Sequence, residues 1–340
     1  MTKSPQWNRR SVLKALAASG SVALPACDQL NVEIKSKPDA VLYDEEGRPY
    51  IPEITSNENF YKYTCCGRPD FKPEDWELKI MDRGDIVARL DKPYLDTLDV
   101  QEIELTLECI GSGPRSQRIN NAIWGGAPLM EVIEGLGVPA PHPSIVEIRM
   151  LGMDGYDASL PLSTVEGAPI WLVWRMNGEP LPDSHGYPAR LMVPDRYGIK
   201  NIKWIEEIEF LDEIYEGYWD QFGWDHQGLY KVNGYILVPA DQSENEGPIH
   251  VLGTAFAGSD PVVKVEVSTG FDIWKEAEFD YAPGPDRWVL WRYFFDPDQP
   301  GEYDITCRVT TESGEVTQGI KGTSPKAGYD GGQKITITVI

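Results

Sequence analysis

The sequence predicts an α+β protein in which a mixed α/β domain is followed by an all-β sandwich. Alternating apolar runs and one stretch with helical spacing share the first two thirds of the chain. Beyond residues 238–248, which are polar, acidic and turn-forming, only short alternating runs occur. The 340 residues suffice for two domains with separate cores, and the aromatic content of 11% favours a β-rich chain.

The first 26 residues are interpreted as a targeting segment. Arg9 and Arg10 precede a short, weakly apolar stretch that is rich in small residues and too short to span a bilayer in the usual way. This pattern is typical of a twin-arginine export signal, and a chance arginine pair is the alternative. Residues 24–27, LPAC, are similar to a lipobox. We therefore expect a periplasmic protein that is either cleaved nearby or anchored to the membrane by a lipid on Cys27.

Residues 27–56 are polar and contain several prolines, so we expect a tether ahead of a first domain that covers residues 57–240. Residues 128–137, PLMEVIEGLG, predict a short helix that Gly137 can end. The run WIEEIEFL has an entirely acidic polar face, which predicts a solvated strand at a sheet edge. Alternation predicts strands at residues 76–80, 102–109, 190–194 and 202–211.

Residues 241–340 are expected to form a β-sandwich that is immunoglobulin-like in architecture. Cys307 alternates with polar residues in one of these strands and is assigned to the core. The expected strands lie at residues 249–257, 262–269, 288–295, 303–310 and 334–340.

The formal net charge of -23 makes nucleic acid an unsuitable partner, because phosphate binding needs clustered lysine and arginine. It also disfavours steering of a small anion unless a local basic pocket overrides the global field. The chain has no CxxC motif and no CxxCH motif, so we expect no haem on this chain. Cys65 and Cys66 are neighbours, which makes them poor disulfide partners for each other.

Cys109 ends an alternating run and precedes a glycine-rich turn, in LTLECIGSGPR. As a strand, this run places Leu105, Leu107 and Cys109 on one face. The residues alone leave three interpretations of Cys109: a core thiol, half of a disulfide, or a metal ligand at the base of a pocket.

Residues 184–210 concentrate cations in an acidic chain. Arg190, Arg196, Lys200 and Lys203 follow His185, which lies in a proline-flanked loop. These side chains could hold an anion together with backbone N–H groups, or they could be scattered surface charge. The composition favours neither interpretation.

Three stretches carry a resemblance to a known family. LECIGSGPR, NNAIWGGAPLMEVIE and MNGEPLPDSHGYPARLMVPDRYGIKNIKWIEEIEF resemble the molybdopterin-binding domain of the sulfite oxidase family. The C-terminal region resembles the immunoglobulin-like dimerisation domain of that family, and the resemblance covers most of residues 57–325. It implies a molybdenum-molybdopterin cofactor and a homodimer.

The resemblance also implies roles for individual residues. Cys109 matches the cysteine whose thiolate ligates molybdenum, which agrees with the preference of soft metal centres for thiolates. The cofactor-binding positions of the family match Phe60, Tyr61, Lys62, Tyr63, Thr64, Asp154, His185, Arg190, Asn201, Ile202 and Lys203.

The chain departs from the family pattern on the substrate side. The sulfite-binding arginine of the family falls at Tyr63, and its substrate-pocket tyrosine falls at Trp224. A desolvated sulfite needs fixed cations or donors, so these changes disfavour sulfite as the substrate. Arg115 or Arg118 could compensate, but the sequence does not place either residue at the pocket.

Four further residues lie near the expected pocket or in loops. Cys66, like its neighbour Cys65, is interpreted as a small half-buried thiol, and a second thiol near molybdenum or a redox-active pair is the alternative. His226 and His142 are interpreted as loop residues, and His226 could instead line the pocket because Trp224 is close in sequence.

We therefore expect an exported molybdenum-cofactor oxidoreductase that transfers two electrons and an oxygen atom to or from a small substrate. Cys109, Tyr63 and Trp224 are its candidate catalytic residues. Its electrons would pass to a separate carrier such as a cytochrome c or a membrane redox partner. One alternative is a reductase of a sulfoxide or another S- or N-oxide. A second is a non-catalytic lipoprotein in which Cys109 is structural.

Overall fold

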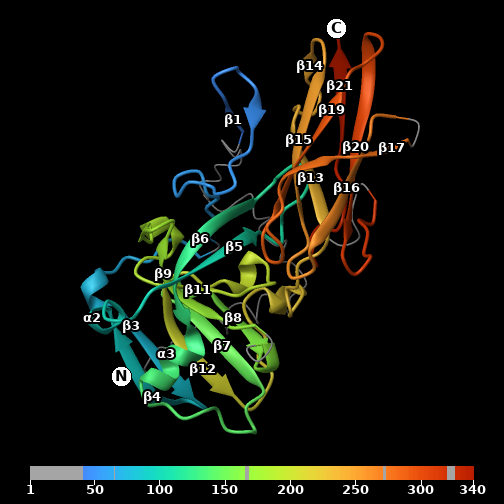
Figure 1. Ribbon diagram of the computed structural model, residues 1–340. Coiled ribbons are helices and arrows are strands. Elements are labelled where there is room, and N and C mark those ends of the chain that lie inside the picture. Colours follow the sequence, from blue (N-terminus) through green and yellow to red (C-terminus); the bar gives the residue numbers. More distant parts are fainter. Residues whose placement is uncertain (1–40, 65, 165–167, 271–272, 320–325) are drawn as a thin grey trace, which may run out of the picture.

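The computed structural model describes residues 41–64, 66–164, 168–270, 273–319 and 326–340 (Figure 1). The expected export signal, Cys27 and Cys65 lie outside these residues. The described residues fold mostly into sheet and include two short α-helices, α2 (Lys92–Leu95) and α3 (Leu129–Gly135). Helix α3 confirms the helix expected at 128–137, but the first domain contains less helix than a mixed α/β fold implies.

Two sheets of the first domain position the candidate site. One sheet has the order β10-β9-β6-β5, and β11 pairs with β9 on the side. The other has the order β4-β3-β12-β7-β8. A core of aliphatic residues and Trp76 packs between the second sheet, α3 and β9. The strands of the first sheet are β5 (Gln101–Glu108), β6 (Ile119–Pro128), β9 (Trp171–Met176), β10 (Glu179–Pro180) and β11 (Arg190–Met192). Those of the second are β3 (Glu77–Asp82), β4 (Asp85–Asp91), β7 (Glu147–Gly152), β8 (Asp157–Pro161) and β12 (Ile205–Leu211). Single 3-10 turns occur at η1 (Pro73–Asp75), η2 (Asp183–His185), η3 (Gly198–Lys200) and η4 (Asp220–Phe222).

Strand β12 corrects the expectation of a solvated edge strand. It lies at the centre of its sheet, parallel to β3 and antiparallel to β7. Its acidic side chains are held there because Arg149 of β7 forms ion pairs with Glu207 at 2.9 Å and Glu209 at 3.2 Å. The acidic side chains of β12 are therefore paired with a cation from the neighbouring strand β7, and β12 can occupy the middle of the sheet.

The C-terminal unit consists of two sheets around one apolar core, in the orders β13-β15-β19-β18 and β14-β21-β20-β16-β17. Cys307 is 1% exposed in this core, as expected. Its strands are β13 (Asn233–Val238), β14 (Glu244–Asn245), β15 (Ile249–Phe256), β16 (Val262–Ser268), β17 (Trp274–Glu276), β18 (Glu278–Tyr281), β19 (Val289–Phe295), β20 (Gly301–Thr311) and β21 (Lys334–Val339).

The boundary between the units lies earlier than the sequence indicates. Strand β13 pairs along its length with β15, so it belongs to the second unit although it precedes residue 241. The polar segment after β13 is a connection inside that unit. The sequence analysis placed the boundary at this connection because its exposed residues are polar. Strand β13 lacks such polarity because most of its residues are buried.

Strand β5 joins the two units (Figure 1). The Thr106 hydroxyl accepts a hydrogen bond from the Trp288 backbone N–H at 2.8 Å, and the Thr106 N–H donates to the Asp286 carbonyl at 2.9 Å. The segment that precedes β3 starts with a hairpin of β1 (Leu42–Tyr43) and β2 (Pro49–Tyr50). After this hairpin the segment contacts the C-terminal unit, where the Glu53 carbonyl accepts a hydrogen bond from the Trp288 indole at 3.0 Å.

Among the described residues, no helix has the length and apolar character that crossing a membrane requires.

Candidate functional site

One pocket of the first domain gathers most of the residues that the sequence predicted. Tyr61, Lys62, Tyr63, Thr64, Cys109, Asp154, His185, Arg190, Asn201, Lys203 and Trp224 all line it. Phe60 and Ile202 lie behind its wall. The Phe60 ring stacks on Tyr61 and meets His185 edge-on, and Ile202 is fully buried in the core.

Cys109 lies where β5 leaves its sheet, and its side chain contributes to the pocket wall. Its backbone N–H donates to the Arg118 carbonyl at 2.9 Å, and its own carbonyl accepts from the Ser112 N–H at 2.8 Å. These bonds fix the thiol at the neck of the turn that joins β5 to β6. The alternating pattern of the strand therefore directs Cys109 to the pocket, on the same face as Leu107.

Arg190 places a buried positive charge in the pocket. It is 3% exposed, and its guanidinium donates only to two backbone carbonyls, those of His185 at 3.1 Å and Asn201 at 3.3 Å. Among the described residues no carboxylate forms an ion pair with it, and its Nε lacks a hydrogen-bond partner. Burial lowers the pKa of Arg190 to about 10, so the side chain stays charged at neutral pH. A charge in this setting favours an anionic partner.

His185 is the neutral member of this group. It is 2% exposed, and its Nε2 donates to the Asn57 carbonyl at 3.0 Å. Burial, and then the charge of Arg190, lower the pKa of His185 to about 3. The imidazole therefore carries no charge at pH 7 and keeps Nδ1 as an acceptor.

Gly186 allows the segments on either side of the pocket to approach closely. Its φ is +116°, and a Cβ there would lie 3.0 Å from the Arg190 Cβ and 3.2 Å from the Lys203 Cα. The Lys203 ammonium donates to the Ser184 carbonyl at 3.2 Å and lies over the Trp204 ring. Glycine is needed because any side chain would push the Arg190 and Lys203 segments apart.

Asn201 and Asp154 complete the cofactor side of the pocket. The Asn201 side chain accepts from the Val193 N–H at 2.8 Å and donates to two backbone carbonyls, so it holds its own loop in shape. Asp154 accepts from the Tyr156 N–H at 3.1 Å, and burial raises its pKa above the usual range.

Part of the pocket lining is aromatic and contains residues that the sequence did not assign. Trp219 and Tyr156 line it beside Trp224, and the rings of the two tryptophans meet edge-on with centroids 5.6 Å apart. Arg118 also lines it, with its guanidinium 5.5 Å from the centre of the Tyr63 ring. Arg115 is exposed and is not among the lining residues.

The position of Arg118 follows from strand register. Glu108 of β5 pairs with Ile119 of β6, so Cys109 and Arg118 are the next pair toward the turn. Opposed residues of an antiparallel pair point to the same face. Extending this register by one residue would have predicted from the sequence that Arg118 lies opposite Cys109.

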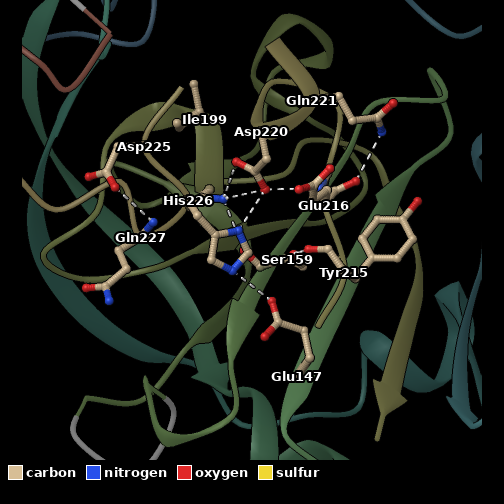
Figure 2. A network of polar contacts seen from close by, with 12 residues as sticks. Glu147, Ser159, Ile199, Tyr215, Glu216, Asp220, Gln221, Asp225, His226 and Gln227 are labelled. Atoms are coloured by element: carbon tan, nitrogen blue, oxygen red, sulfur yellow. Dashed lines mark hydrogen bonds and ion pairs between the residues drawn. The ribbon is translucent and has the colours of Figure 1, made fainter. Parts of the chain in front are cut away.

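A polar network joins the loop between Trp219 and Trp224 to neighbouring segments through Asp220 and His226 (Figure 2). Asp220 lies at its centre and accepts from the Lys200 ammonium at 3.2 Å, from His226 Nδ1 at 3.0 Å and from the Gly217 N–H at 3.0 Å. His226 Nε2 lies 3.1 Å from a Glu147 oxygen.

His226 therefore lies in this network and is not among the lining residues. Its hydrogen bonds to Asp220 and Glu147 raise the pKa of His226 to about 9.

Comparison with known proteins agrees with this geometry. Residues 66–219 match the family described as oxidoreductase molybdopterin binding domain. The mitochondrial sulfite oxidase of Drosophila melanogaster is 26% identical over 84% of this chain and 61% of its own. The sulfite oxidase of Arabidopsis thaliana is 29% identical over 62% of this chain and 67% of its own. Residues 66–219 are therefore an oxidoreductase molybdopterin binding domain, and the chain as a whole is similar to sulfite oxidases.

The family resemblance extends to the fold of both units. The chain superposes on the sulfane dehydrogenase SoxCD of Paracoccus pantotrophus with a TM-score of 0.70, over 86% of this chain and 87% of that one. Sequence identity in that comparison is 18%, so it establishes the fold alone. The chain spans about three fifths of the length of the fly and rat sulfite oxidases.

The pocket fits the cofactor that the family implies. Arg190 offers a desolvated guanidinium to a phosphate, and Cys109 offers a sulfur ligand at the pocket wall. Gly186 allows the segments that carry Arg190 and Lys203 to pack closely beside the pocket. These residues would hold molybdopterin with its phosphate toward Arg190 and its metal toward Cys109.

Proposed function

We propose that this protein is an exported molybdenum-molybdopterin oxidoreductase that transfers an oxygen atom and two electrons to or from a small substrate. The observation that carries the proposal is the pocket in which the Cys109 thiol and the buried Arg190 charge face the same space. When bound, the cofactor supplies the two-electron redox chemistry, as cofactors do in general. The chain supplies a metal ligand, an orientation and a closed environment.

The side chains of the pocket divide this work between two sides. Arg190, neutral His185 and Lys203 bind and orient the cofactor through charge and hydrogen bonds. Trp219 and Trp224 form an apolar wall that limits the access of water to the reacting atoms. Tyr63 lies at the substrate side, where its hydroxyl can donate a hydrogen bond to substrate oxygen.

The proposal also covers the cellular location, the electron carrier and the oligomeric state of the protein. A twin-arginine signal and Cys27 support a periplasmic location, released or lipid-anchored. Electrons would pass to a separate carrier such as a cytochrome c or a membrane redox partner. The two-sheet C-terminal unit would be an immunoglobulin-like dimerisation domain that makes the protein a homodimer.

Metal and pterin analysis tests the proposal. We expect about one molybdenum and one pterin per chain in protein folded in its native host, and Cys109→Ser should lose the molybdenum. Cys307→Ser is the matched control, because that thiol lies in the core of the other unit and its loss should leave the metal content unchanged. Protein without molybdenum and pterin would instead support a non-catalytic lipoprotein.

A reductase of a sulfoxide or another S- or N-oxide is a second candidate. It is favoured by the neutral Tyr63 and by the Trp219–Trp224 wall, which suit an uncharged substrate with an apolar part. Assays with sulfite and with a panel of sulfoxides, using artificial electron carriers, decide the direction. Turnover of sulfoxides alone would establish the reductase.

A further inference from the structure

We propose that protonated His226 is a positioning residue that holds the pocket-lining tryptophans of its loop in place, so that the proton on this side chain regulates the site. These tryptophans are Trp219 and Trp224, whose rings meet edge-on. His226 is not among the lining residues and acts through Asp220, which lies between the two tryptophans in sequence. The inference rests on the proposed function, and it names a regulation of the same site.

An ion pair joins two segments that both contribute to the pocket lining. Lys200 lies between Ile199 and Asn201, which line the pocket. Its ammonium donates to both carboxylate oxygens of Asp220, at 3.2 Å and 3.3 Å, and to the Ser159 carbonyl at 3.1 Å. Because Lys200 is buried, loss of its carboxylate partner would leave a desolvated charge. The pair therefore ties the loop of Asp220 to the segment of Lys200.

His226 adds a second connection, because it contacts acidic side chains from two elements. Its Nδ1 lies 3.0 Å from an Asp220 oxygen, and its Nε2 lies 3.1 Å from a Glu147 oxygen (Figure 2). Both ring nitrogens carry a proton only in the charged imidazolium, so only that form can serve both carboxylates. Glu147 belongs to β7, which lies between β12 and β8 in its sheet and gives the loop a fixed anchor.

The charged groups around His226 favour the imidazolium at neutral pH. Hydrogen bonds to Asp220 and Glu147 raise the pKa of His226 to about 9. Burial and the Lys200 ammonium oppose this rise. Asp225 of the same loop acts on Lys200, whose own pKa is lowered by burial. When the pH rises through 9, His226 loses one of its two donors, and the loop keeps the ion pair with Lys200 alone.

Fluorine NMR of the holoprotein labelled with 5-fluorotryptophan tests this role without an activity assay. Trp219→Phe and Trp224→Phe identify two of the 11 tryptophan signals. Both signals should shift between pH 7 and pH 10 in the wild type, with a midpoint near pH 9. His226→Gln should lose this titration and show at pH 7 the shifts of the wild type at pH 10, because glutamine is uncharged like neutral imidazole. His142→Gln is the matched control at an exposed histidine, and it should titrate like the wild type.

Two outcomes of the NMR titration would overturn the proposal. One is a wild type in which neither signal shifts between pH 7 and pH 10. The other is a titration that persists in His226→Gln, because Lys200 would then be the titrating group.

Steady-state assays with sulfite and with methyl phenyl sulfoxide give a second readout. For the compound that the wild type turns over, kcat/KM at pH 7 should fall about tenfold or more in His226→Gln, because a displaced lining positions the substrate poorly. An unchanged kcat/KM would also overturn the proposal. Molybdenum content is measured on the same preparations. Protein without molybdenum contradicts the proposed function, whereas the fluorine titration reports on His226 in either case.

Discussion

At the scale of single residues, the half-buried Arg149 and the buried Arg190 differ in what surrounds them. Arg149 forms ion pairs with Glu207 and Glu209 and lies over the Tyr215 ring. Arg190 donates to the backbone carbonyls of His185 and Asn201, and no carboxylate of the described residues forms an ion pair with it. The first arginine completes a structural network, whereas the second is a desolvated charge that the fold leaves available for a ligand.

Arg190→Gln should therefore affect the cofactor more than the fold. We expect at least a tenfold loss of bound pterin, with a change of about 1 kcal/mol or less in the unfolding free energy of cofactor-free protein. Arg149→Gln is the comparison, and it should cost about 1–3 kcal/mol because it leaves carboxylates unpaired. Pterin fluorescence and urea unfolding measure the two effects. Severe destabilisation by Arg190→Gln with normal pterin content would assign Arg190 to the fold.

At the scale of elements, the loop that contains η4 depends on charges from two other segments, η3 and β7. Asp220 of η4 is bound by Lys200 from η3 and by His226 from the end of the loop, and His226 also contacts Glu147 of β7 (Figure 2). The loop carries Trp219 and Trp224 on its other side. Its ion pairs consequently set the position of the aromatic wall.

This arrangement predicts a loss of stability at alkaline pH. The pKa of His226 is raised from 6.5 to about 9, so folding favours the protonated imidazole. Its contribution to stability should be complete below pH 6.5 and disappear as the pH rises through 9. Because His226 is partly exposed, we expect about 1–2 kcal/mol.

Urea unfolding at pH 6 and pH 9.5 measures the effect. His226→Gln should reduce the difference between the two values, and His142→Gln, at an exposed histidine, should leave it intact. An identical difference in the wild type and His226→Gln would contradict the role of His226.

The strands show which parts of the fold could be predicted from the sequence alone. Period-two alternation predicted β3 and β20, because these strands bury alternate residues. It also predicted β5 and β15, although consecutive residues of these two strands are buried. It placed β12 at an edge, since nothing in the local pattern indicates that Arg149 arrives from β7. Two-residue strands such as β10 and β14 are too short to show a period.

The sequence also predicted some residues of the candidate site and missed others. The resemblance predicted a set of cofactor-binding residues because the motif around His185 and Arg190 is contiguous in sequence, and most of these residues line one pocket. Trp219 and Tyr156 were missed because they reach the pocket from loops whose paths depend on long-range contacts. Arg118 was considered but could not be placed, because its position needs the register of two strands.

At the scale of the whole molecule, the two units share the strand that leads to Cys109. The Glu108 carboxyl is fully buried between them and contacts the Tyr235 hydroxyl and the Asn233 amide, both at 2.9 Å. Burial raises the pKa of Glu108 to about 8. The C-terminal unit thus supports the residue immediately before the candidate metal ligand, and the two units form one structural frame for the site.

The chain has a formal net charge of -23, and this charge predicts how the rate of electron transfer to an external acceptor depends on salt concentration. With a basic cytochrome c as acceptor, the second-order rate should fall several-fold between 10 mM and 200 mM salt. Ferricyanide is the control, because repulsion of this anion is screened by salt and its rate should rise. Stopped-flow reduction measures both rates. A flat dependence with the cytochrome would contradict attraction by the acidic surface.

The hairpin between β5 and β6 places Cys109, the candidate metal ligand, and Arg118, a lining residue of the pocket, at the two ends of one short turn. A small change confined to residues 110–117 can therefore shift Arg118 relative to Cys109 while both strands keep their pairing. The shape of the pocket in such a scaffold can diversify by substitution within a single turn. A library restricted to these positions would be a compact starting point for directing this protein toward new substrates.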